Sequence, residues 1–129
     1  MGTDDDVHIE WNPVMVEQAI YKTAQRISKG VMAADKAYRE FLRADHDFDK
    51  AEARAYVGEA LQSCPAHERK YRMILDPSVE AARDKRDVAD AVYRLMDKNL
   101  KAIQGELDAL RSIGTSVRQA YATAGTGER

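Results

Sequence analysis

A stretch of roughly 45 residues without an internal proline, from Asp76-Pro77 to about Tyr121, constrains the fold of this chain most strongly. As one helix it would be about 66 Å long, given a rise of about 1.5 Å per residue. A single amphipathic helix cannot bury its own apolar face, so this stretch must pack against another surface. Its apolar positions are spaced by threes and fours: Val92, Met96, Leu100, Ile103, Leu107, Leu110, Gly114, Val117 and Tyr121.

The spacing within this stretch is not a clean heptad when it is counted through Asn99. The steps then run four, three, four and four between Val92 and Leu107. Two consecutive fours predict a stutter, which locally relaxes a left-handed supercoil. Two interpretations of Asn99 remain open: it sets the register between helices, or it faces water while Leu100 takes the core position.

A second periodic stretch begins near Asn12-Pro13, which is typical of an N-cap followed by the first helical residue. We expect one heptad seam along it, with Gly30 off the seam and Asp45 on a seam position. No Gly or Pro occurs between Asp45 and Gly58, so we expect the helix to run on past Asp45, with a bend there as the alternative. The predicted seam residues are Ile20, Ala24, Ile27, Val31, Ala34, Tyr38, Phe41 and Phe48.

The two stretches are separated by a break from Gly58 to Pro65 and by a short segment, Ala66–Leu75, that favours helix over strand. We therefore predict an all-α fold in which two long helices form an antiparallel hairpin with a short connecting segment. The expected parts are a flexible acidic arm (1–11), a helical hairpin domain (12–122) and a disordered tail (123–129). Such a hairpin leaves apolar edges exposed, so we also expect a homo-oligomer.

Composition and motifs argue against several classes of protein. The chain has one cysteine, which excludes an internal disulfide framework and favours a reducing compartment. It shows neither a membrane span nor a signal peptide, so we expect an intracellular protein. The run Asp45, Asp47, Asp49 resembles the start of a calcium loop, but Lys50 and Tyr56 stand where that loop needs Gly and Glu. We expect no metal, no cofactor and no catalytic activity.

Basic residues form the more informative pattern. Five cations recur every seven positions and define what we call the basic stripe: Lys22, Lys29, Lys36, Arg43 and Lys50. On a helix the basic stripe is either a solubilising outer face or a surface about 42 Å long that follows a phosphate backbone. The segment His67–Arg72 offers the same two interpretations, because it combines Arg69, Lys70 and Arg72 with a tyrosine.

The ten residues from Gly105 to Gly114 read GELDALRSIG and resemble the C-terminal segment of the UvsY family, whose pattern there is G-x-L-D-A-[LI]-[RK]-S-x-G. UvsY proteins are phage recombination mediators that help to load a recombinase onto single-stranded DNA. In that family a Lys-x-Arg pair followed by a tyrosine, late in the first long helix, is tied to DNA binding. Arg54 and Tyr56 match this pattern, whereas Glu52 replaces the lysine and Lys50 is the nearest substitute.

The resemblance implies a ring of helical hairpins that binds single-stranded DNA without a catalytic step, in a phage-infected or prophage-carrying bacterium. Recombinase and single-strand-binding protein would be its further partners. The alternative is a helical structural or adaptor protein whose charges only solubilise it. The expected DNA contacts are Lys36, Arg43, Lys50, Arg54, Tyr56, Arg69, Lys70 and Arg72. The expected core or assembly residues are Ile27, Phe41, Ile103, Leu107, Leu110 and Val117.

Overall fold

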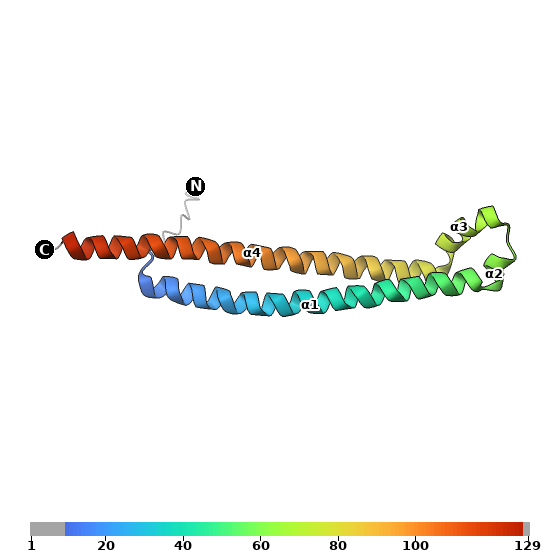
Figure 1. Ribbon diagram of the computed structural model, residues 1–129, viewed down its shortest axis with the longest axis horizontal. Helices are drawn as coiled ribbons and strands as arrows, with labels where there is room; N and C mark the ends of the chain where they lie inside the picture. Colours follow the sequence, from blue (N-terminus) through green and yellow to red (C-terminus); the bar gives the residue numbers. More distant parts are fainter. Residues whose placement is uncertain (1–9, 128–129) are drawn as a thin grey trace, which may run out of the picture. The chain divides into compact units, whose positions relative to one another are not determined.

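The computed structural model describes residues 10–127, and within that range it contains four helices and no strand (Figure 1). The two long helices α1 and α4 pack together and are joined by two short ones, as the sequence predicts. Within the described range no helix is long and apolar enough to cross a membrane. The helices are α1 (Pro13–Val57), α2 (Glu59–Gln62), α3 (Ala66–Leu75) and α4 (Pro77–Gly127).

Both long helices begin at the predicted caps. The side-chain oxygen Oδ1 of Asn12 accepts a hydrogen bond from the backbone N–H of Met15 at 2.9 Å, and Pro13 is the first residue of α1. Asp76 caps α4 in the same way, with Oδ1 2.9 Å from the N–H of Ser78 and 3.2 Å from that of Val79. The Ser78 hydroxyl also donates to Asp76, and this bond, with the backbone bonds, lowers the pKa of the Asp76 carboxyl.

The ends of the helices differ in part from the predicted ones. α1 continues without a break past Asp45 to Val57, as expected, and α3 has the predicted bounds. α4, in contrast, ends at Gly127 and so includes five residues that we assigned to the tail. Most of the predicted acidic arm (1–9) lies outside the described residues.

The chain divides into two compact units. In the first unit, the part of α1 up to Lys29 packs against the part of α4 from Lys101 (Figure 1, blue and red). A Cβ added to Gly114 would meet Cγ1 of Val16 at 3.0 Å and Cδ1 of Ile20 at 3.9 Å. Val16 and Gly114 therefore face each other, and the antiparallel register then sets Ile20 opposite Leu110 and Ile27 opposite Ile103.

In the second unit, Gly30–Leu100, the rest of α1 packs against the start of α4, with α2 and α3 at the turn. Its buried cluster consists of Phe48, Ala51 and Val79, against which Ala82 also packs. The Tyr38 and Tyr93 rings lie 5.1 Å apart. The resulting register sets Ala37 opposite Tyr93 and Gly30 opposite Leu100.

Burial corrects the predicted seam of α1. Ala24, Val31 and Tyr38 are exposed, whereas Gly30, which we placed off the seam, is half-buried. The series of seam positions that starts at Ile20 and repeats every seven residues is as predicted. The second series follows it by three residues and not by four, so Asp45 lies beside the seam. Every residue of the observed seam is buried or half-buried: Val16, Ile20, Thr23, Ile27, Gly30, Ala34, Ala37, Phe41, Ala44, Phe48, Ala51 and Ala55.

The seam of α4 is likewise an uninterrupted heptad, so the predicted stutter is wrong. Tyr93, and not Val92, occupies the seam. Leu100 occupies the seam two positions further on, whereas Asn99 is exposed. The six predicted core or assembly residues all lie on the two observed seams. The seam of α4 consists of Val79, Ala82, Arg86, Ala89, Tyr93, Met96, Leu100, Ile103, Leu107, Leu110, Gly114 and Val117.

In some layers of the two helices a small residue faces a large one, although Ile20 faces Leu110 and Ile27 faces Ile103. Gly114 lies opposite Val16, and the register places Ala82 opposite Phe48 and Gly30 opposite Leu100. A small residue lets the partner helix approach closely and leaves room for the large one, which is how close packing is reached in a two-helix core. The register of each pair is therefore specified by side-chain volume as well as by hydrophobicity.

Candidate nucleic-acid interface

The basic stripe lies along the outer surface of α1. All five of its residues are exposed, and successive members are about 10.5 Å apart along the helix, because seven residues separate them. Within residues 10–127 none of the five forms an ion pair. The basic stripe is therefore a row of cations available to an external anion.

Most other arginines of the described chain differ in this respect, because they already have a carboxylate partner. Arg26 donates to Glu106 at 2.6 Å, and these two residues lie on opposite helices of the first unit. Four more arginines pair with a carboxylate on their own helix at 3.0 to 3.3 Å: Arg39 with Asp35, Arg72 with Glu68, Arg86 with Asp87 and Arg94 with Asp90. Cations without an ion pair also occur elsewhere in residues 10–127, at Lys70, Arg83, Lys85, Lys98 and Arg118, so the basic stripe differs from them by its regular spacing on one face of α1.

Arg54 extends this face toward the end of α1. It lines a hollow of about 320 Å³ in the second unit, together with Asp47 of α1 and with Ser78 and Lys85 of α4. Alanines supply the remaining lining: Ala44, Ala51, Ala81 and Ala82. Lys85 was missed by the sequence analysis, because only the register of α4 against α1 brings it to Arg54. Asp47 offsets part of the positive charge at this point.

The segment 67–72 is not the uniform basic surface that its sequence predicts. The guanidinium of Arg69 is turned inward, where Nε donates to the Leu61 carbonyl at 3.1 Å and Nη2 to the Gln62 carbonyl at 3.4 Å. Both carbonyls stand at the end of α2, where that of Leu61 also accepts from the backbone N–H of Cys64 at 3.3 Å, so Arg69 links α3 to α2. Arg72 is paired with Glu68, which leaves Lys70 as the exposed, unpaired cation of the segment.

Two exposed tyrosines accompany these cations. Tyr56, near the end of α1, is 49% exposed, and Tyr71 on α3 is 65% exposed. Exposed tyrosine rings next to cations are the side chains on which bases of single-stranded nucleic acids stack. Of the eight predicted DNA contacts, seven are therefore at the surface and one, Arg69, is engaged with backbone.

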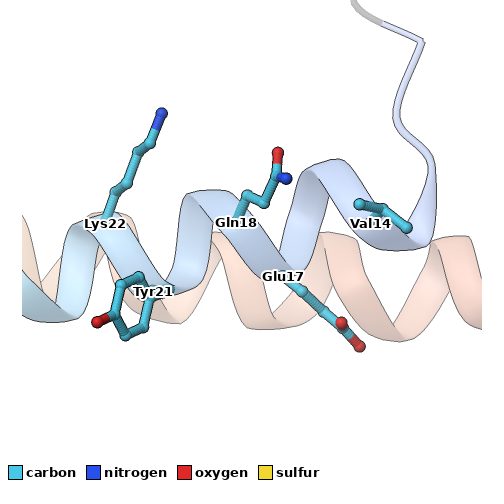
Figure 2. Close-up of a pocket in the computed structure, with 5 residues that line it drawn as sticks. All are labelled: Val14, Glu17, Gln18, Tyr21 and Lys22. Carbon is cyan, nitrogen blue, oxygen red and sulfur yellow. The ribbon is translucent and has the colours of Figure 1, made fainter.

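A surface hollow of about 450 Å³ near the start of α1 offers no comparable site. Its lining comes from one helix: Val14, Glu17, Gln18, Tyr21 and Lys22. Figure 2 shows that Gln18 and Lys22 point to one side of α1 and Glu17 and Tyr21 to the other, so these side chains do not converge on a common ligand.

Other chemistry-bearing residues form no cluster within the described range. No group of three or more His, Cys, Asp or Glu side chains is placed to hold a metal ion there. Cys64 is buried, and its thiol donates to the Leu61 carbonyl, with 3.0 Å between sulfur and oxygen. Asp45, Asp47 and Asp49 lie on the continuous helix α1, where alternate residues point in different directions and cannot form a calcium loop.

Comparison with known proteins assigns no family to the chain. No family model, no curated protein and no solved structure matches it.

Proposed function

We propose that this protein binds the backbone of single-stranded DNA as a homo-oligomer and acts as a recombination mediator of the UvsY kind, without a catalytic step. The observation that carries the proposal is the row of five exposed cations without ion pairs that recur every seven residues along α1. The motif from Gly105 to Gly114 supplies the mediator class. In an oligomer the stripe is repeated, so that weak sites add up to useful avidity.

The contacts we propose run along the basic stripe to the end of α1. Lys36, Arg43, Lys50 and Arg54 would contact phosphates, and Tyr56 would offer its ring to a base. Lys70 and Arg72 on α3 would add weaker contacts. Arg69 is left out, because its donors are used by the α2 carbonyls.

The test is binding of a fluorescent oligo-dT to the whole chain over a series of salt concentrations. The variant Lys50→Gln/Arg54→Gln removes two proposed phosphate contacts. Lys98→Gln/Arg118→Gln on α4 is the matched control, since it removes the same charge from exposed positions away from the stripe that likewise form no ion pair within the described residues. Each phosphate contact to a single strand adds about 0.7 to the slope of log affinity against log salt.

We expect the native chain and the control to share one slope and the stripe variant to show a slope smaller by about 1.4. Absence of binding by the native chain at low salt contradicts the proposal and leaves the adaptor alternative. An equal loss in both variants contradicts the assigned face, because it means that only net charge matters.

A further inference from the structure

Two exposed apolar stripes remain unused by the proposed DNA contacts, and both lie within the second unit. The α1 apolar stripe consists of Val31, Tyr38 and Leu42, which are 50%, 42% and 37% exposed. The α4 apolar stripe consists of Val88, Val92 and Leu95, which are 64%, 39% and 62% exposed. Contiguous exposed apolar side chains of this kind mark an interaction surface.

Each stripe follows a second heptad seam on its helix. On α4 the positions Lys85, Val88, Val92 and Leu95 step by three, four and three. On α1 the positions Tyr38, Leu42, Asp45 and Asp49 step by four, three and four. These are the steps of the seams that hold α1 and α4 together, so each stripe is shaped to receive another helix.

The two stripes lie on opposite flanks of the helix pair. Tyr38 packs on Tyr93, whereas Val88 and Val92 line a hollow of about 370 Å³ that Glu40 of α1 also lines. Glu40 follows Tyr38 by two residues, so their side chains point in directions about 200° apart around α1. One chain thus offers two different surfaces, facing away from each other.

The charges next to the stripes are complementary. Asp45 and Asp49 continue the α1 apolar stripe, seven residues after Tyr38 and Leu42, and Lys85 precedes Val92 by seven on α4. Within the described residues none of these three forms an ion pair. When the two helices run antiparallel with Val88 opposite Leu42, Lys85 stands opposite Asp45.

We infer that the α4 apolar stripe of one chain docks on the α1 apolar stripe of a second copy, with Lys85 of one against Asp45 of the other. The partner is a second copy because in this register Val92 also stands opposite Tyr38, so that two apolar pairs lie beside the pair of opposite charges. The contact is heterologous, so it repeats from chain to chain and builds a ring or a filament rather than a closed dimer. The basic stripe is separate from the α1 apolar stripe and lies on the side of α1 that carries Glu40, since Lys36 and Arg43 line a hollow together with Glu40.

This inference deepens the homo-oligomer in the proposed function, and mass measurement by light scattering at micromolar concentration tests it apart from DNA binding. Val88→Glu/Leu95→Glu disables the α4 stripe, and Val31→Glu/Leu42→Glu disables the α1 stripe. All four positions are exposed and Glu is a good helix former, so both variants keep the helix pair, which circular dichroism verifies. Val14→Glu/Val57→Glu is the control, since it exchanges two exposed apolar residues outside the stripes.

We expect the native chain and the control to be oligomers and each stripe variant to fall to the monomer mass of 14.5 kDa. A mixture of the two stripe variants should regain a species of twice that mass, because each contributes the one surface that the other lacks. A monomeric native chain, an oligomer in either variant alone, or a mixture that stays monomeric would each overturn the inference.

DNA binding is scored separately on the same samples. The stripe variants retain every residue of the basic stripe, so they should still bind a short oligo-dT at low salt. Loss of assembly with retained binding therefore leaves the proposed DNA contact intact, and loss of binding with retained assembly contradicts the proposed DNA contact alone.

Discussion

Replacement of two glycines in α4 by alanine separates helix propensity from packing. Gly105 is exposed, and a Cβ added there would meet no atom within 4 Å. Gly114 is buried, and its added Cβ would stand 3.0 Å from Cγ1 of Val16. Both glycines lie inside the same helix and the same unit, so each serves as the control for the other.

The expected magnitudes follow from these surroundings. Alanine is favoured over glycine by about 0.8–1.0 kcal/mol in a helix interior, so Gly105→Ala should raise the free energy of unfolding by about that amount. Gly114→Ala has the same gain, but overpacking against Val16 costs about 1–3 kcal/mol. The net effect at Gly114 should range from about zero to a loss of about 2 kcal/mol.

The assay is urea unfolding followed by circular dichroism, at two protein concentrations so that association is separated from folding. Val16→Ala in the Gly114→Ala background should remove the overpacking, and the double variant should be more stable than the sum of the two single effects predicts. If Gly114→Ala stabilises as much as Gly105→Ala, the close contact between Val16 and Gly114 is wrong, and with it the register of the first unit.

Two further changes test the ends of the helices. Asp76→Ala should lower the melting temperature, whereas Asp76→Asn should keep most of it, because the amide oxygen can still accept the N–H groups of Ser78 and Val79. Since the pKa of Asp76 is lowered in the folded chain, its contribution is complete above the unfolded pKa and is lost as the pH falls through the folded pKa, so the native and Asp76→Ala melting temperatures should converge in acid. Arg69→Ala should lower the melting temperature with little change in DNA affinity. Lys70→Ala should lower the DNA affinity with little change in melting temperature. A large loss of affinity in Arg69→Ala would contradict the assignment of Arg69 to the α2 carbonyls.

The sequence predicted where the two long helices begin and where α1 ends, but not the end of α4, because only the former carry local signals. Asn12 followed by Pro13, and Asp76 followed by Pro77, each combine a side-chain acceptor with a residue that needs no N–H partner. Both caps form as expected. Gly58 likewise marks the end of α1.

The seam could not be predicted fully, because the deciding information lies on the partner helix. Considered alone, α1 favours Val31 and Tyr38 over Gly30 and Ala37 for the core, since they are larger and more apolar. The structure buries the small residues instead. In the register of the two helices, Leu100 and Tyr93 of α4 stand opposite these small residues. A rule that considers one helix at a time cannot predict this arrangement.

The candidate interface was predictable to the extent that it depends on one helix. The seven-residue spacing of Lys36, Arg43 and Lys50 already specified a single exposed face. The roles of Arg69 and Lys85, in contrast, depend on contacts between elements. Arg69 meets carbonyls of α2, and Lys85 comes to Arg54 only through the pairing of α4 with α1.

The layers in which a small residue faces a large one have a consequence for sequence change. Since Gly114 faces Val16 and Ala82 packs on Phe48, an enlarged residue on one helix leaves the layer unstrained only if the residue opposite becomes smaller. Variation at such positions should therefore be reciprocal in volume. Among diverging relatives of this chain, the sum of the two side-chain volumes in a layer should be steadier than either volume alone.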